Sequence, residues 1–173
     1  MKNAAASSAD GVGRDDSEEL IRTMQSVEHA RCIVCGGDNP VGLKLEFVTE
    51  GRGRVSASFA CPQALQGYAG LLHGGIISAL IDGAMTNCLF SLGISAVTAE
   101  LSVRYLAPVA VDHPAQVTAT LERSRGPLHC LQAELRQHDR VLVRACGKFV
   151  DRRRASAAGN PQVPAAGMGR EDR

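Results

Sequence analysis

Aromatic residues are scarce in this chain: Tyr and Phe make up 3% of its 173 residues, and tryptophan is absent. Proteins that bind single-stranded nucleic acid stack the bases on aromatic side chains, so such a role is not expected. An excess of charge is also lacking, because 19 Lys and Arg against 18 Asp and Glu leave a formal net charge of +1. A polyanionic partner requires a basic surface, so we expect no nucleic-acid partner.

Long apolar runs are missing as well. No stretch of about 18 residues is free of polar groups, as a membrane span would be, and the polar first twenty residues do not resemble a secretory signal. Six cysteines could form disulfides, but Cys88, Cys130 and Cys146 lie within helix-like or strand-like patterns, which favours buried free thiols. We therefore expect a cytoplasmic protein with no membrane partner.

The length fits one domain between two tails. Residues 1–26 are expected to be a largely disordered tail, apart from a weak helical stretch at 17–27. Residues 151–173 are rich in Ala, Gly, Pro and Arg without periodicity, which predicts a second disordered tail. The folded domain is expected at 27–150.

The pattern of apolar residues predicts the elements of this domain. Alternation of apolar and polar residues predicts strands at 43–47 and 55–59. The segment 73–92 is apolar almost all round, which is typical of a buried helix. Four more strands are then expected, and the short connections between them predict antiparallel neighbours. The resulting fold is α+β, with one curved sheet around one helix; the four strands lie at 97–106, 115–124, 128–137 and 140–150.

Asp82 lies in the middle of the apolar helix segment. A buried carboxylate must be paired, hydrogen-bonded or used in chemistry, because an isolated buried charge is costly. Ser78 and Thr86 lie four residues before and after Asp82, so the three side chains share one stripe of the helix. At the front end, His73-Gly74-Gly75 supplies backbone N–H groups where a developing negative charge is stabilised. Together these features favour acyl chemistry.

Three stretches resemble the hotdog-fold acyl-CoA thioesterases, of the type related to the phenylacetate-pathway thioesterase. The most specific feature is HGG with an acid eight residues after the first glycine, which matches the catalytic pattern of that family. The resemblance covers residues 29–150 and implies a hotdog fold, a curved antiparallel six-stranded sheet wrapped around one long buried helix. The stretches are CIVCGGDNPVGLKLEF at 32–47, LQGYAGLLHGGIISALIDGAM at 65–85 and TAELSVRYLAP at 98–108.

The resemblance also implies catalytic roles. Gly74 falls where the family's backbone amide polarises the thioester carbonyl, and Asp82 falls on the carboxylate that acts as nucleophile or general base. Thr86 and Thr98 fall where some members place a hydroxyl that holds the attacking water or orients the acid. We therefore expect Asp82, Gly74, Thr86 and Thr98 to be the catalytic residues.

Substrate binding is expected from the loop before the helix. His73 and Gly75 belong to the HGG motif, and the resemblance implies that His73 shapes the loop rather than transferring protons. Many family members place Asn or Gln seven residues before the amide-donating glycine, whereas this chain has Gly67 there. Either the neighbouring Gln66 makes that contact to the carbonyl, or the second donor is missing.

We accordingly expect a hydrolase that cleaves the thioester of an acyl-CoA without a metal or other cofactor, since a thioester is already activated. Gly74 and Asp82 lie about 12 Å apart along one helix, too far to act on the same carbonyl. This distance predicts a homodimer with active sites at the subunit interface, and the resemblance implies a dimer or a dimer of dimers. The alternatives are a hotdog dehydratase that acts on an acyl thioester and a non-catalytic acyl-CoA-binding protein.

His29, Cys32 and Cys35 have the spacing of metal ligands, and Cys61 could supply a fourth. A single Cys-x-x-Cys without a second pair is a weak signal, and the resemblance implies no metal here. We therefore favour a tight turn that leads into the first strand. The remaining histidines lie near turns or strand edges and are expected at the surface; they are His113, His129 and His138.

Overall fold

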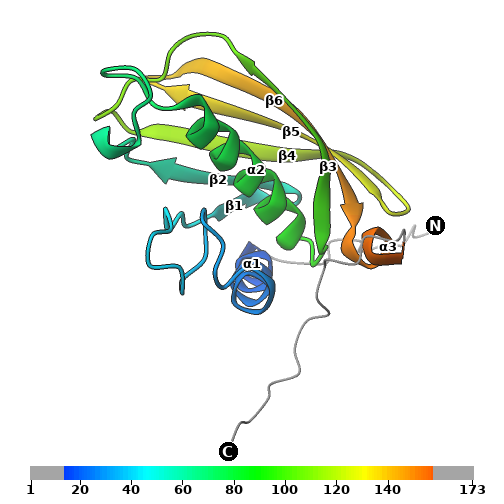
Figure 1. Ribbon diagram of the computed structural model, residues 1–173. Helices are drawn as coiled ribbons and strands as arrows, with labels where there is room; N and C mark the ends of the chain where they lie inside the picture. Colours follow the sequence, from blue (N-terminus) through cyan, green and yellow to red (C-terminus); the bar gives the residue numbers. More distant parts are fainter. Residues whose placement is uncertain (1–13, 158–173) are drawn as a thin grey trace, which may run out of the picture.

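A six-stranded antiparallel sheet curves around one long helix, α2 (Gly74–Phe90), in a computed structural model that describes residues 14–157 (Figure 1). This arrangement confirms the expected α+β hotdog fold. The other helices are α1 (Arg14–Glu28), the 3-10 helix η1 (Gln63–Leu65) and α3 (Arg152–Ala157). The strands are β1 (Val48–Gly51), β2 (Arg54–Phe59), β3 (Ala96–Tyr105), β4 (Ala115–Arg125), β5 (Leu128–Gln137) and β6 (Arg140–Asp151).

The strands follow the order β1-β2-β4-β5-β6-β3 across the sheet. Strands β4, β5 and β6 form the expected meander, but β3 pairs with β6, so the prediction that it neighbours β4 is wrong. The reason is the connection 106–114, which crosses the end of the sheet instead of turning back on β3. It is held there by the Leu106 N–H, which donates to the Leu142 carbonyl (2.8 Å), and by the Val109 carbonyl, which accepts from Leu72 N–H (2.9 Å). Strand β3 is consequently an edge strand.

Helix α2 forms the centre of the core, with the sheet curved around it (Figure 1). Among its side chains Leu80, Ile81, Met85, Leu89 and Phe90 are all at most 1% exposed. The second half of the helix can be apolar all round because residues 83–90 are all buried. Among the described residues, no helix is both long enough and apolar enough to cross a membrane.

The segment 43–47, expected as a strand, does not pair with the sheet. Leu45 and Phe47 are buried, as the alternation predicts. The Leu45 N–H, however, donates to the Val34 carbonyl (2.9 Å) in the preceding loop. The sheet begins only at Val48. The alternation therefore predicted correctly which side chains are buried, but it did not predict which residues the backbone bonds to.

Both expected tails contribute helices. Ile21 of α1 is 2% exposed and belongs to the core, so a domain boundary at residue 27 falls inside a packed helix. Helix α3 shows that the expectation of a disordered tail is wrong for residues 152–157. Its first residue, Arg152, forms an ion pair with Glu28 (Nη1–Oε2 3.0 Å). The parts of the expected tails at 1–13 and 158–173 lie outside the described residues.

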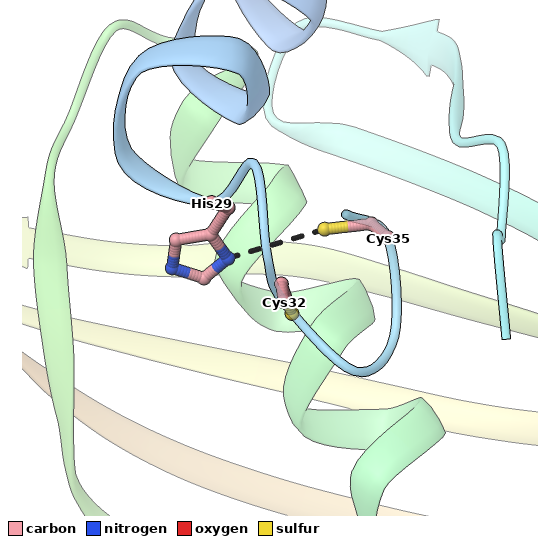
Figure 2. A group of neighbouring side chains, drawn as sticks. All are labelled: His29, Cys32 and Cys35. Carbon is pink, nitrogen blue, oxygen red and sulfur yellow. Dashed lines mark hydrogen bonds between the residues drawn. The ribbon is translucent and has the colours of Figure 1, made fainter. Parts of the chain in front are cut away.

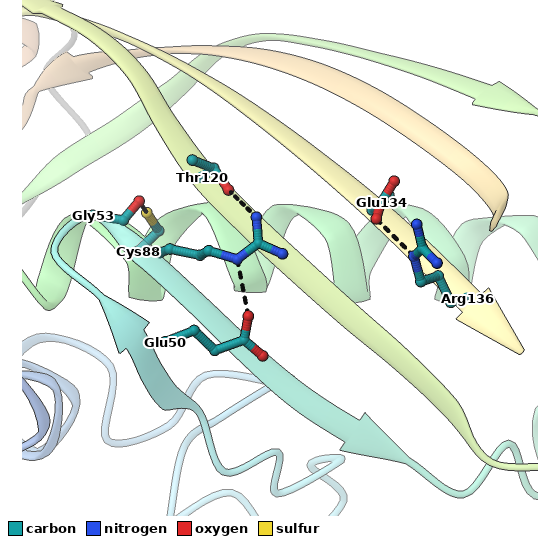
Figure 3. Close-up of polar contacts among 7 residues, drawn as sticks. Glu50, Gly53, Cys88, Thr120, Glu134 and Arg136 are labelled. Atoms are coloured by element: carbon teal, nitrogen blue, oxygen red, sulfur yellow. Dashed lines mark hydrogen bonds and ion pairs between the residues drawn. The ribbon is translucent and has the colours of Figure 1, made fainter. Parts of the chain in front are cut away.

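Polar contacts fasten the β1–β2 hairpin to its surroundings (Figure 3). Arg54 forms an ion pair with Glu50 (Nε–Oε2 2.9 Å) and donates from Nη1 to Thr120 Oγ1 on β4 (3.4 Å). The buried Cys88 thiol of α2 donates to the Gly53 carbonyl in the hairpin turn (3.1 Å). The end of the hairpin is thereby tied to both the sheet and the central helix.

All six cysteines are free thiols, as expected. Cys88 is fully buried and Cys130 is half-buried, but Cys146 is exposed, so the prediction of burial is wrong for this residue. The cause is the strand period: Cys146 lies between the buried residues Ala145 and Gly147 of β6 and so points to the opposite, outer face.

Candidate active site at helix α2

The N-terminus of α2 is capped by its own histidine. His73 has an extended backbone conformation, and its Nδ1 accepts from the Gly75 N–H (2.9 Å). Gly74 is the first residue of the helix, so its N–H has no acceptor within the helix and lies at the positive end of the helix dipole. The cap therefore engages the Gly75 N–H and does not involve the Gly74 N–H.

A tyrosine that sequence reasoning missed lies against this N-terminus. The Tyr105 hydroxyl, at the end of β3, donates to the Gly74 carbonyl (2.9 Å) and lies 2.8 Å from Ser78 Oγ. Its side chain fixes the first turn of α2 relative to the edge strand, so Tyr105 positions Gly74. The signal in the sequence was weak: Tyr105 is one of two tyrosines and lies inside the stretch TAELSVRYLAP.

The carboxylate of Asp82 is held by the edge strand. Thr98 on β3 donates from Oγ1 to Asp82 Oδ1 (2.6 Å). Thr98 precedes an irregularity in the β3–β6 pairing, between Thr98 and Glu100. The structure thus brings together two of the four expected catalytic residues, one from the helix and one from the sheet.

Burial raises the pKa of Asp82 above the ordinary value of an aspartate. The hydrogen bond from Thr98 opposes this effect, since it stabilises the charged form. Smaller effects come from the loop before β1, where Cys32 raises the pKa and His29 lowers it. A carboxyl group with a raised pKa is a better proton acceptor than an ordinary aspartate, which is what a general base needs.

Thr86 lies one helical turn after Asp82 and is 6% exposed. In the described part of the chain, the hydrogen bond to Asp82 comes from Thr98 rather than from Thr86. Gly74 and Asp82 remain eight residues apart on one straight helix, or about 12 Å. One chain therefore does not bring the Gly74 amide and the Asp82 carboxylate to a single small group.

Gln66 and Gly67 lie in the loop before α2. Gln66 is exposed, and its Oε1 accepts from the Gly70 N–H (3.0 Å), so the carbonyl end of its side chain is engaged within the loop. A Cβ at Gly67 would lie 3.1 Å from His73 Cδ2, tighter than an ordinary contact. A side chain at this position would therefore press on the ring of His73.

Two sizeable cavities lie away from Gly74 and Asp82. The first, of about 600 Å³, lies between α1 and residues 44–48, and Cys35 lines part of its wall. The second, of about 440 Å³, is lined by residues of α1, the β1–β2 turn and β4, among them Ser17, Gly53 and Ser124. Neither lining includes Gly74, Asp82 or Thr98.

The structure brings His29, Cys32 and Cys35 together (Figure 2). His29 Nδ1 lies 3.9 Å from Cys35 Sγ, and the hydrogen bond between the two thiols lowers the pKa of Cys32 and raises that of Cys35. Cys61, considered as a fourth ligand, is elsewhere: its thiol donates to the Phe59 carbonyl (3.7 Å). The donor set of this cluster is one imidazole and two thiols, which suits a transition metal such as zinc.

One of the three histidines expected at the surface is buried. His129 is 3% exposed, with Nδ1 2.9 Å from Ser124 Oγ and Nε2 2.9 Å from Asp151 Oδ1. The sequence predicted a position at a strand edge, whereas the ring is buried and contacts Asp151, the last residue of β6. His113 and His138 are exposed, as expected, and their rings lie 5.2 Å apart.

Part of the chain is similar in sequence to known proteins. Residues 69–144 match the family model described as Thioesterase superfamily. The chain is 32% identical over 80 residues to acyl-coenzyme A thioesterase THEM4 of Rattus norvegicus, which is 46% of this chain and 34% of the relative. The chain thus spans about a third of the length of that relative.

Solved structures agree on the fold. A thioesterase superfamily protein is 26% identical, with a TM-score of 0.66, and the match covers 73% of this chain and 67% of that one. The PaaI protein of the E. coli phenylacetic acid degradation operon is 15% identical, with a TM-score of 0.67 and coverage of 80% and 94%. The six-stranded sheet wrapped around α2 is thus the hotdog fold of these solved structures, and the part of the chain that carries the HGG motif is similar to the thioesterase superfamily.

Proposed function

We propose that the protein hydrolyses the thioester bond of an acyl-CoA and releases a carboxylic acid and free coenzyme A. The observation that carries the proposal is the partly buried Asp82 carboxylate, which is held by Thr98 and belongs to the same helix whose first N–H is that of Gly74. The rat relative is named an acyl-coenzyme A thioesterase, which supports the substrate class.

In the proposed reaction Asp82 accepts a proton from water while the water oxygen attacks the carbonyl carbon. The Gly74 N–H donates to the resulting oxyanion, an interaction worth about 3–4 kcal/mol per donor. The carbon–sulfur bond then breaks, and the departing thiolate takes up the proton held by Asp82.

In the alternative mechanism, Asp82 attacks the carbonyl carbon directly and forms a mixed anhydride, which water hydrolyses. Single turnover in ¹⁸O-labelled water separates the two, because attack of water on the Asp82 side of the anhydride leaves label in the Asp82 peptide.

His73, Gly75 and Gln66 are assigned to substrate binding through the loop that they form. The Nδ1 of His73 accepts from the Gly75 N–H, so this nitrogen is occupied as a helix cap. A hotdog dehydratase would need a histidine base at the reacting carbon, and the capping role of His73 favours the thioesterase.

We place the active site between two subunits related by a two-fold axis, with the two copies of α2 antiparallel. Gly74 of one subunit would then face the Asp82 carboxylate of the other and close the 12 Å gap, roughly eight residues of helix. Exposed apolar side chains near Gly74 support an interface there: Tyr68 is 83% exposed, Tyr105 50% and Leu106 44%. Strand β3, an edge strand, would pair with its copy. Two such dimers could form a tetramer, and sedimentation equilibrium measures which assembly exists.

A panel of acyl-CoAs with aromatic and aliphatic acyl groups, assayed with a thiol-reactive dye, tests the proposed reaction. Release of thiol at a rate that depends on the acyl group supports hydrolysis. Saturable binding without release, measured by calorimetry, would instead make the protein a non-catalytic acyl-CoA binder. Formation of an enoyl product with the thioester intact would identify a dehydratase.

The cytoplasm is the proposed site of action, because all six cysteines are free and a reducing compartment keeps thiols unpaired. Separation of cell fractions followed by antibody detection tests this placement. Recovery in an oxidising compartment would contradict it.

A further inference from the structure

Three side chains that coordinate transition metals converge beside α2, outside the proposed active site. The Nδ1 of His29 and the Sγ atoms of Cys32 and Cys35 all lie within 4.8 Å of one another (Figure 2). A tetrahedral zinc site with Zn–S near 2.3 Å and Zn–N near 2.05 Å has N···S separations of roughly 3.6 Å and S···S separations of roughly 3.8 Å. The observed N···S distance of 3.9 Å, between His29 and Cys35, is close to that geometry.

The backbone of residues 29–36 turns tightly around the Cys32 sulfur. The Cys32 N–H donates to the His29 carbonyl (2.9 Å), and the Gly36 N–H donates to the Cys32 carbonyl (3.0 Å). The Val34 N–H points at Cys32 Sγ (3.4 Å), which is the kind of hydrogen bond that supports a thiolate bound to a metal. A Cβ at Gly36 would lie 2.3 Å from the Cys32 backbone nitrogen, so only glycine allows the chain to close here. The backbone therefore holds the two cysteines in position before any ion binds.

Neighbouring residues hold the His29 ring in place, and the cluster is accessible to an ion. The His29 ring packs edge-on against Phe90 of α2, with 4.9 Å between centroids and an interplanar angle of 84°. Cys35 is buried, yet it lines the cavity of about 600 Å³ between α1 and residues 44–48. The cavity gives a hydrated ion access to Cys35, and His29 and Cys32 are only half-buried; an entry path of this kind is one requirement of a metal site.

We propose that His29, Cys32 and Cys35 bind one zinc ion, with a water molecule as the fourth ligand. The donor set suits zinc because thiolate and imidazole are its preferred ligands and three protein ligands leave one position for solvent. Binding releases two thiol protons, and the two thiolates balance the charge of Zn²⁺. Cys61 does not take part, since its thiol bonds to the Phe59 carbonyl.

The ion would fix the loop 29–36, which begins directly after α1 and packs against α2. The contact is close: a Cβ at Gly83 would lie 2.6 Å from Val34 Cγ1. Gly83 directly follows Asp82, so a metal that fixes this loop also fixes the stretch of helix that carries the carboxylate. Binding of the ion stabilises the folded chain by mass action.

Cobalt(II) titration of the reduced, metal-free full chain tests the site. We expect one cobalt per chain, with a thiolate-to-cobalt charge-transfer band and the visible bands of tetrahedral cobalt, both abolished by added zinc. Cys32→Ser and His29→Gln should lose the bands or weaken them at least tenfold in affinity. Cys146→Ser is the matched control, because Cys146 is an exposed free thiol outside the cluster, and it should bind like the wild type.

Thermal unfolding with and without zinc gives a second readout that does not depend on activity. Zinc should raise the midpoint of the wild type and of Cys146→Ser, but not that of Cys32→Ser, with circular dichroism confirming that each variant is folded. Equal cobalt spectra in Cys32→Ser and Cys146→Ser would overturn the proposal. Failure of the reduced wild type to bind metal would also overturn the proposal. If oxidation of that protein then lowers its mass by two hydrogens through a Cys32–Cys35 disulfide, the two cysteines form a redox pair instead.

Discussion

The hydroxyl of Thr98 donates to Oδ1 of Asp82 across 2.6 Å and so joins the edge strand β3 to the middle of α2. This bond lowers the pKa of Asp82, whereas burial raises it, and burial has the larger effect. The carboxyl group is consequently both positioned by the sheet and made more basic than an ordinary aspartate.

Asp82→Asn should lower turnover by a factor on the order of 10²–10⁴ while substrate still binds, because the amide cannot accept the proton from water. The variant should also unfold at a higher temperature at neutral pH. When the pKa of a carboxyl group is higher in the folded protein than in the unfolded chain, the group stabilises the fold at pH values below its pKa in the unfolded chain. This stabilisation is lost as the pH rises through the pKa of the group in the folded protein. The gain in stability from the substitution should therefore shrink as the pH is lowered. Near wild-type turnover in a folded variant would make Asp82 a structural acid.

Thr98→Val should move the acid limb of the kcat/KM profile to higher pH. Removal of the hydroxyl takes away the bond that lowers the pKa of Asp82, so the carboxylate protonates at a higher pH and activity is lost sooner on acidification. Thr98→Ser keeps a hydroxyl and is the control, with a limb close to that of the wild type. An unmoved limb in Thr98→Val would show that another group titrates.

Gly74→Pro should abolish most activity with little loss of fold. Proline lacks the N–H that is proposed to bind the oxyanion, and it fits the first position of a helix. His73 has the extended conformation (ψ 133°) that a residue before proline prefers. Gly74→Ala retains the N–H, and its Cβ would meet Tyr105 at an ordinary 3.6 Å. We expect a loss of about 10²–10³-fold in turnover for proline and a small effect for alanine; equal activities would exclude the amide as the oxyanion donor.

Asp82→Asn and Gly74→Pro should complement one another when the two chains are refolded together. A mixed dimer has one site with Gly74 and Asp82 both intact and one site with neither, so an equal mixture should regain about a quarter of wild-type activity. Chains with different affinity tags allow the mixed dimer to be isolated and assayed. An inactive mixed dimer, or an active monomer at the assay concentration, would disprove the shared site.

Gly83→Ala should destabilise the fold, because its Cβ would lie 2.6 Å from Val34 Cγ1. Overpacking of this kind costs about 1–3 kcal/mol, against which alanine's better helix propensity gains about 1 kcal/mol. Val34→Ala in the same chain makes room, so the double variant should be more stable than the sum of the two single changes predicts. Denaturant unfolding of the four proteins measures this coupling, and strict additivity would show that the contact is not tight.

The local sequence pattern was sufficient to predict helix α2 and five of the six strands. The segment 73–92 contains α2, and the four strands expected after it match β3 to β6 to within one residue at each end. These elements were predictable because side-chain periodicity records which face of each element is buried. The same reasoning found the alternation at 43–47 but could not tell that its backbone bonds to a loop, since burial and strand pairing are separate properties.

Tertiary structure alone decided where β3 lies. A short connection favours pairing of consecutive strands, yet the residues after β3 cross the sheet and β3 pairs with β6. Pairing with a distant strand depends on the sum of many contacts, which no local pattern reports. This placement is what brings Thr98 to Asp82 and Tyr105 to Gly74.

The sequence by itself determined the chemistry that the chain can offer: an acid within an apolar helix, glycines at the start of that helix, and a His-x-x-Cys-x-x-Cys spacing. It left open which of these groups meet. The structure decided that Thr98 bonds to the acid, that Cys61 lies away from the His29 cluster and that His129 is buried. The physical reason is that residue type and spacing fix local geometry, whereas contacts between distant segments are set by the packing of the whole core.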